Sequence, residues 1–192
     1  IFGTLRLVAG LVGCNAEAES WISACQQRHH DIAAEAARWP RRPRVYFEEW
    51  DVPAISAIRW VSELVGVAGG DDIFPQRATA SLGRDRIVAD GAEVVAAAPD
   101  IIIGSWCGKK FRPEQVAARP GWGAIPAVRD GELHEIKSPL ILQPGPAALT
   151  DGLDRLQAII AAIRSGAAHM PLPICALPES PSAKPMATLR FS

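Results

Sequence analysis

The sequence predicts an α/β fold, in which an open and mostly parallel sheet is flanked by helices. Two observations lead to this fold class. From residue 44 onward, short apolar segments alternate with segments of helical character, and such alternation builds a sheet through right-handed crossovers. The run "IIIGS" at 101–105 is apolar almost throughout, as expected of a parallel strand that is covered on both faces.

The first forty residues predict a separate helical segment. Residues 3–38 are rich in Ala, Glu and Gln, and the first proline of the chain is Pro40. Gly10 and Gly13 are expected to interrupt the helix. The prolines of "WPRRPR" at 39–44 end it, because each proline lacks a backbone donor and restricts the residue before it.

The first strand and the helix after it are predicted at 44–50 and 53–70. "RVYFEEW" is short, β-branched and aromatic, which favours a strand. Pro53 stands near the expected start of the helix, and a Gly-Gly pair closes it. The apolar stripe of this helix would consist of Ile55, Ile58, Leu64 and Val65.

The rest of the chain continues the pattern up to residue 164. The predicted elements are a helix at 91–100, a strand at 101–105, a helix at 112–122, two strands within 124–136 joined by a turn at Asp130-Gly131, and a helix at 145–164. Residues 167–192 are rich in proline and show no periodicity, which predicts a disordered tail.

Composition excludes several classes of partner. Lys and Arg number 20 and Asp and Glu number 21, so we expect no basic surface for nucleic acid. The apolar first residues are too short and too interrupted by glycine to span a bilayer, and we expect no transmembrane segment. The four cysteines show no CxxC or Cys/His metal spacing, and we expect neither a metal site nor a resident cofactor.

Tryptophans follow two of the predicted strands. Trp50 ends the strand at 44–50, and Trp106 comes directly after the strand at 101–105. In open α/β sheets the ligand crevice lies beyond the carboxyl ends of the strands, so both indoles are candidates for one ligand-binding edge. A lid over the hydrophobic core is the alternative for each. Trp122 precedes a predicted strand and is a weaker candidate.

An enzyme is the alternative from another functional class. Cys107 could act as a thiolate nucleophile, because Lys109 and Lys110 would favour its ionised form. His134 would then be the base, although nothing in the spacing links it to the cysteine. "GVAGGDD" follows a helix and lacks the glycine order of a nucleotide-binding fingerprint.

Three stretches of the chain resemble a known family. They are "RPRVYFEEWDVPAISAIRWVSELVGVAGGDDIFP", "AAAPDIIIGSWCGKKFRPE" and "IPAVRDGELHEIKSPLILQPGPAAL". They are similar to the C-terminal lobe of cobalamin-binding proteins, which belong to the substrate-binding proteins of ABC importers for cobalamin, haem and iron-siderophores. The similarity covers residues 44–164, and "GSWCGKKFRP" and "EIKSPLILQPGP" point to the cobalamin branch.

The resemblance implies two α/β lobes joined by one long helix, with the ligand between the lobes. Residues 1–40 would be the interlobe connecting helix, 41–166 the C-terminal ligand-binding lobe and 167–192 a tail, with the N-terminal lobe absent. The implied ligand is cobalamin or another corrinoid, and the implied partner is an ABC transporter permease. The implied location is periplasmic, or extracytoplasmic and membrane-associated.

Haem or an iron-siderophore complex is the alternative ligand. A siderophore site would favour several arginines or tyrosines around an anionic complex, and Tyr46 is the only tyrosine. Relatives place an acid and an arginine in the loop at 137–143, where this chain has Pro139 and Gln143. That departure leaves the partners of the ligand's polar groups open.

The resemblance and the strand-end argument together give the expected site residues. The expected ligand-binding residues are Trp50, Ile55, Trp106, Cys107, Trp122, Lys137, Ser138 and Gln143. Glu93 is the residue expected to contact the permease, with a solvated helix glutamate as the alternative.

Overall fold

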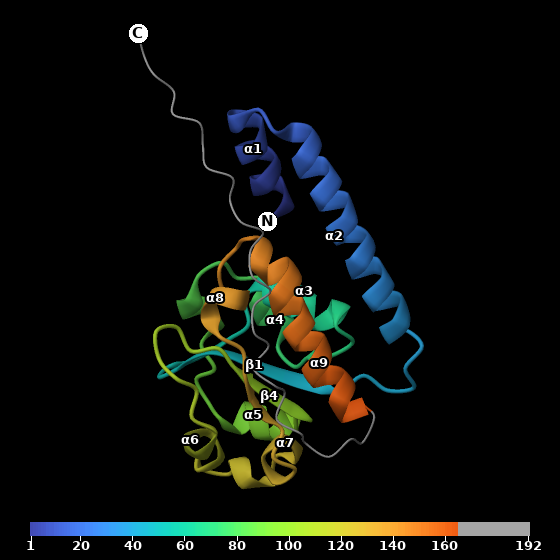
Figure 1. Ribbon diagram of the computed structural model, residues 1–192. Helices are drawn as coiled ribbons and strands as arrows, with labels where there is room; N and C mark the ends of the chain where they lie inside the picture. The colour runs from blue at the N-terminus through green and yellow to red at the C-terminus, as the bar shows by residue number, and fades with distance from the viewer. Residues whose placement is uncertain (165–192) are drawn as a thin grey trace.

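The computed structural model describes residues 1–164, which form a sheet between two layers of helices (Figure 1). The sheet has the strand order β2-β1-β4-β5, with β3 beside β1. The strands are β1 (Arg44–Asp51), β2 (Ala54–Ser56), β3 (Asp71–Asp72), β4 (Ile101–Gly104) and β5 (Leu133–Glu135). β3, β4 and β5 belong to the parallel part with β1, and β2 is antiparallel to β1. The predicted open and mostly parallel sheet is confirmed.

Helices cover both faces of the sheet (Figure 1). One layer holds α2 (Asn15–Ala36), α3 (Arg59–Val67) and α9 (Leu153–Arg164), and the other holds α5 (Ala92–Ala97), α6 (Pro113–Ala117) and α7 (Pro126–Arg129). Short turns complete the lobe: α4 (Pro75–Ala78), η1 (Gly83–Arg86), η2 (Trp122–Ala124), α8 (Ser138–Ile141) and the π-helical η3 (Ala148–Gly152).

Strand β1 contributes to both hydrophobic cores. Its alternate side chains Val45 and Phe47 pack into the first core, and Tyr46 between them packs into the second. All three are buried, because successive side chains of a strand point to opposite faces. β1 therefore packs against both helical layers.

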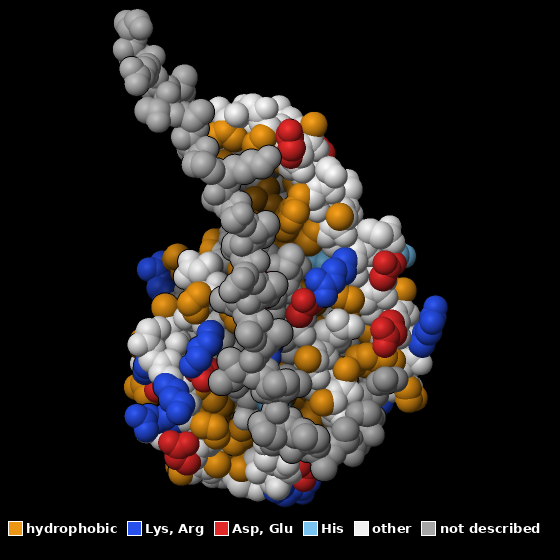
Figure 2. Space-filling view, in the orientation of Figure 1, with side chains coloured by type: hydrophobic (Ala, Val, Ile, Leu, Met, Phe, Trp, Pro, Cys, Tyr) orange, Lys and Arg blue, Asp and Glu red, His pale blue; other side chains and the backbone are white. Residues whose placement is uncertain are grey.

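The N-terminal segment is a helical hairpin. α1 (Phe2–Val12) and α2 meet at Gly13, whose φ of 76° is a left-handed conformation that glycine adopts without strain. The interruption at Gly13 is confirmed, whereas Gly10 lies inside α1. Hydrophobic side chains are visible on this hairpin at the top of Figure 2. The large exposed apolar residues of the hairpin are Leu7, Val8, Leu11, Val12 and Trp21. Within residues 1–164 no helix combines the length and apolarity needed to cross a bilayer.

The helix predicted at 53–70 begins later than expected, at Arg59. The residues before it form β2, in which Ile55 pairs with Trp50 across the hairpin. Ile55 was expected in the apolar stripe of the helix, but a short apolar segment suits a strand equally well. Residues 54–56 become a strand because they pair with the free edge of β1, whose backbone N–H and C=O groups need hydrogen-bond partners there.

The strand predicted at the start of 124–136 is wrong. Residues Pro126–Arg129 form α7, because a proline suits the first turn of a helix, where its missing N–H is not needed. The turn is confirmed at Gly131, with a φ of 77°, and the second predicted strand is β5.

The other helices are confirmed with different ends. The helix predicted at 112–122 is the shorter α6, and the helix predicted at 145–164 is a π-helical turn, η3, followed by α9 from Leu153. Helix ends depend on packing and capping more than on apolar periodicity, so their bounds are the least predictable feature. The predicted tail at 167–192 lies outside the described residues.

Gly104, at the end of β4, allows the Phe111 ring to close over the sheet. A Cβ at Gly104 would overlap that ring, whereas a Cβ at Gly123 meets nothing within 4 Å. We expect Gly104→Ala to lower the free energy of unfolding by about 2 kcal/mol, because the buried ring must move. Urea denaturation measures the change, with Gly123→Ala as the matched control. Equal stability of the two variants would contradict this account of the packing.

Candidate ligand-binding edge of the sheet

The carboxyl ends of three parallel strands meet at one edge of the sheet. Glu48 of β1 lies opposite Gly104 of β4, and Gly104 lies opposite Glu135 of β5. The segments that continue from these positions are 48–51, 104–112 and 135–143, and we call them together the carboxyl edge. Open α/β folds bind their ligands at such an edge.

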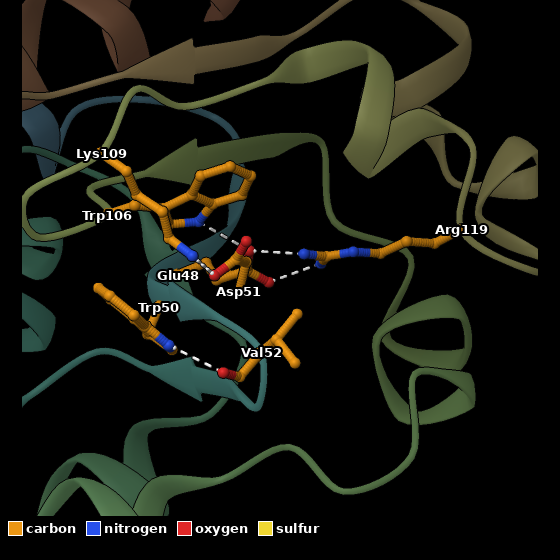
Figure 3. Close-up of polar contacts among 7 residues, drawn as sticks. All are labelled: Glu48, Trp50, Asp51, Val52, Trp106, Lys109 and Arg119. Atoms are coloured by element: carbon orange, nitrogen blue, oxygen red, sulfur yellow. Dashed lines mark hydrogen bonds and ion pairs between the residues drawn. The ribbon is translucent and has the colours of Figure 1, made fainter.

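A fully buried carboxylate lies beneath the carboxyl edge. Glu48 accepts two hydrogen bonds from the guanidinium of Arg119, at 2.6 and 2.9 Å. The indole N–H of Trp106 and the hydroxyl of Tyr46 also donate to it, each at 3.0 Å. We call these four residues the Glu48 cluster, and Figure 3 shows Trp106 and Arg119 pointing toward the carboxylate of Glu48. The carboxylate thus accepts four hydrogen bonds, two of them from a cation, and these compensate a charge that would otherwise be costly to bury.

The buried charge alters the ionisation of its neighbours. Burial raises the pKa of the Tyr46 hydroxyl well above its usual value, and the charge of Glu48 adds to the effect. Burial opposes the positive charge of Arg119, but the hydrogen bonds and charge of Glu48 outweigh it and raise the pKa of the guanidinium. Both partners therefore keep their protons at neutral pH, and the cluster is a fixed part of the lobe.

Two of the three candidate tryptophans are buried. Trp106 is 3 % exposed, and its ring meets Phe111 edge to face with centroids 5.0 Å apart. Trp122 is 2 % exposed and lies 4.5 Å from the Arg119 guanidinium, measured to its ring centre. In this structure both indoles belong to the second hydrophobic core, which for Trp106 is the alternative interpretation. Their contact with a ligand stays a prediction.

Trp50 is the candidate tryptophan that stays partly accessible. Its side chain is half-buried, and its indole N–H donates to the carbonyl of Val52 at 2.9 Å. Ile55, its partner across the β1–β2 hairpin, is also half-buried. The structure thus places these two predicted ligand residues at paired positions of the β1–β2 hairpin, beside the end of β1.

Lys109 links the two tryptophans that follow the strands. Its Nζ lies 4.1 Å from the centre of the Trp50 ring and 5.6 Å from that of Trp106. The same ammonium group pairs with the carboxylate of Asp51, as Figure 3 shows. Sequence reasoning considered Lys109 only as a neighbour of a thiol. Its position against two indoles could not be found without the fold, because it depends on how the loop after β4 returns over β1.

The third part of the carboxyl edge is the loop after β5. Lys137 pairs with Glu135 at 2.7 Å, and Glu135 also accepts the backbone N–H of Phe111 at 3.1 Å. Ser138 begins α8, and Gln143 is exposed after it. The structure places these predicted ligand residues after the end of β5, and their role in binding stays a prediction.

The proposed nucleophile and base lie on different parts of the lobe. Cys107 is exposed in the turn after β4, next to Gly108 with a φ of 74°. His134 lies within β5, and its Nε2 is 2.8 Å from the carboxylate of Glu132. Their joint role in catalysis stays a prediction. In the described part of the chain, no group of three or more His, Cys, Asp or Glu side chains is arranged to hold a metal ion.

Glu93 lies on α5, in the second helical layer. Its carboxylate pairs with Arg77 at 2.6 Å, and its side chain is 39 % exposed. Arg77 also lies over the ring of Phe74, 4.7 Å from its centre. The carboxylate is thus held in place yet remains open to a second partner, and its contact with a permease stays a prediction.

A pocket of about 750 Å³ adjoins the Glu48 cluster. Its polar lining comes from Asp51, Asp90 and Arg119, and its apolar lining includes Trp122 and the exposed side of α5. Sequence reasoning did not find this pocket, because its walls come from β1, α5 and the turn before η2. Only the tertiary structure brings these segments together.

A sequence model of the periplasmic binding protein family matches residues 1–140. The chain belongs to this family. The resemblance stated from the sequence is confirmed at this level. A comparison with curated proteins finds no significant match.

Solved structures of such proteins share the fold. Staphylococcus aureus IsdE, complexed with heme, has a TM-score of 0.67 at 15% identity, over 83% of this chain and 63% of that protein. The vitamin B12-binding protein BtuF of Vibrio cholerae has a TM-score of 0.56 at 18% identity, over 80% and 55%. A possible iron-binding protein from Staphylococcus epidermidis has a TM-score of 0.67 at 17% identity, over 83% and 60%. The chain therefore spans less than two thirds of the length of these proteins, and identities this low show the fold alone.

Arg119 is the cation that compensates the buried charge of Glu48. We expect Arg119→Met to lower the free energy of unfolding by about 3 kcal/mol, because the carboxylate then stays buried without a counter-charge. Adding Glu48→Gln to this variant should recover part of the loss, since no charge remains buried. Urea denaturation of the wild type, the two single variants and the double variant gives the coupling energy.

Arg112→Met is the matched control for this cycle. The Arg112 side chain is 58 % exposed and lies 3.9 Å from Glu114, and exposed pairs of this kind contribute at most about 1 kcal/mol. A coupling energy near zero between positions 48 and 119 would show that the Glu48 cluster does not hold the edge together.

Proposed function

We propose that this chain forms one ligand-binding wall of the substrate-binding protein of an ABC import system, and that the ligand is cobalamin or another corrinoid. The observation that carries the proposal is that Trp50, at the carboxyl end of β1, and Ile55, its partner in β2, are both partly exposed. Membership of the periplasmic binding protein family supports the class of protein. A vitamin B12-binding protein is among those with a similar fold.

The chemistry of a corrin ring suits this surface. The ring is broad and amphipathic, and amide groups surround its rim. Trp50 and Ile55 would cover part of one face, while Ser138 and Gln143 would hydrogen-bond to rim amides. An indole that is fully covered buries on the order of 150–250 Å², which corresponds to a gross gain of a few kcal/mol at about 25 cal/mol per Å². Association costs take much of this gain, so tight binding needs a second surface on the opposite face of the ligand.

Haem is the second candidate ligand, since the similar structures include a protein complexed with heme. Its flat apolar ring would use the same indole surface. An iron-siderophore complex is less well supported, because the single tyrosine of the chain, Tyr46, is buried in the Glu48 cluster. Its hydroxyl is therefore not accessible to an anionic iron complex.

The proposed partner is the permease of the import system. Binding proteins of this class deliver their ligand on the outer side of the cytoplasmic membrane, which gives the proposed location, periplasmic or membrane-associated outside the cytoplasm. Glu93 is the proposed docking residue, because its carboxylate is partly exposed and already oriented by Arg77.

Titration of the full-length gene product with cyanocobalamin, followed by tryptophan fluorescence, tests the ligand. We expect saturable quenching at micromolar ligand or below, and we expect Trp50→Ala to weaken binding about tenfold without changing the melting temperature. Trp106→Ala should instead lower the free energy of unfolding by about 3 kcal/mol, because that indole is buried. Absence of quenching at micromolar cyanocobalamin would remove the cobalamin assignment.

Whether the ligand is chemically changed distinguishes the binding protein from the enzyme alternative. After incubation with the wild type or with Cys107→Ser, we expect mass spectrometry to recover the ligand unchanged, and we expect iodoacetamide treatment to leave binding intact. Turnover that the wild type supports and Cys107→Ser abolishes would favour an enzyme.

Docking is tested with membranes that contain the cognate permease. We expect Glu93→Gln to weaken association about fivefold and to reduce its salt dependence, because one charge at the rim of the interface is lost. Glu114→Gln is the matched control, since Glu114 is also an exposed acid in the first turn of a helix of the same layer. Equal effects of the two variants would exclude a specific role for Glu93.

A further inference from the structure

Lys109 occupies the surface that a flat ligand would need. Its ammonium group lies 4.1 Å from the centre of the Trp50 ring, within range of a cation–π contact. The second indole, Trp106, is 5.6 Å away but buried. A ligand that stacks on this face of Trp50 must therefore move the ammonium group.

Within residues 1–164, Lys109 forms an ion pair with one acidic side chain. That partner is Asp51, whose side chain is 14 % exposed, while that of Lys109 is 39 % exposed. The exposed loop 107–110 carries a second lysine, Lys110, and no acid. The chain as a whole has a formal charge of -1, so the positive charge at this loop is a local feature.

We propose that Lys109 is a specificity-determining residue, which selects flat macrocyclic ligands that carry an anionic group, a carboxylate or a phosphate, at the rim next to Trp50. The inference rests on the proposed function and adds to it the charge of the ligand. It concerns the same edge of the sheet but assigns a role to a residue that the sequence resemblance did not.

One movement of the Lys109 side chain does two things. It uncovers the Trp50 ring, and it brings the ammonium group to the rim of the stacked ligand. An anionic group there forms a charge-assisted hydrogen bond with the ammonium group, which compensates for the lost cation–π contact and the weakened pair with Asp51. A neutral ligand displaces the ammonium group from the ring and offers no such partner, so it is selected against.

Two pairs of probes separate the sources of the anionic group. Haemin and its dimethyl ester differ by two carboxylates. Cyanocobalamin and dicyanocobinamide differ by the nucleotide loop with its phosphodiester. We expect the wild-type full-length gene product to prefer the anionic member of at least one pair about tenfold. The pair that shows the preference identifies the group as a carboxylate or a phosphate.

The decisive measurement is the same preference in Lys109→Gln. We expect it to fall to about one, with most of the loss in the affinity for the anionic probe and little change for the neutral one. Lys110→Gln is the matched control, because it removes an equal charge one residue away and should keep most of the preference. Circular dichroism melting curves check that both variants fold.

Asp51→Asn gives an independent readout in the opposite direction. Removing the carboxylate frees the ammonium group of Lys109 and removes a repulsive charge, so we expect tighter binding of the anionic probe, by about threefold. The lost repulsion contributes in any background, so the part of the gain that needs the ammonium group is the part that disappears when Asp51→Asn is combined with Lys109→Gln.

The outcomes distinguish this inference from the proposed function. If the probes bind but Lys109→Gln weakens the anionic and neutral members equally, the role of Lys109 is overturned and the proposed function stands. If Lys110→Gln removes as much of the preference as Lys109→Gln, the charge of the loop acts without a specific residue, and the inference also fails. If no probe binds to the wild type, the proposed function fails and the inference with it.

Discussion

The buried ion pair between Glu48 and Arg119 is the interaction on which the carboxyl edge depends. It joins the end of β1 to a turn far along the chain, and through the indole N–H of Trp106 it also holds the loop after β4. The two hydrophobic cores supply most of the driving force for folding. They do not, however, determine the orientation of a side chain at the end of a strand. The carboxylate of Glu48 does determine this orientation, because each hydrogen-bond donor that it loses leaves a buried charge less well satisfied.

This constraint sorts the tryptophans of the edge into two kinds. Trp106 donates its N–H to the buried carboxylate and is drawn into the interior. The N–H of Trp50 is satisfied locally by a carbonyl of its own hairpin, so its ring can stay near the surface. One face of this partly exposed ring lies against the ammonium group of Lys109. Hydrogen bonding in the interior thus decides which of the two indoles stays partly exposed.

The similar structures show that the fold persists at low sequence identity. Proteins at 15% and 18% identity keep the arrangement, although one is complexed with heme and the other binds vitamin B12. Apolar residues of suitable size suffice to build the two cores, whereas recognition depends on a few side chains in the loops that follow the strands. In this chain we propose that those side chains are Trp50, Ile55 and Lys109, the last paired with Asp51.

The sequence by itself determined the sheet and the edge where its strands end. The isoleucines of β4 give the strand apolar side chains on both of its faces. This pattern is typical of a parallel strand buried between two layers of helices. It did not determine β2, since Ile55 suits a helix or a strand and only pairing with β1 distinguishes them. Nor did it reveal Glu48, because a glutamate at a strand end is usually solvated and its cation is distant in sequence. Only the tertiary structure decided these features, since burial and ion pairing are contacts between segments that local patterns do not encode.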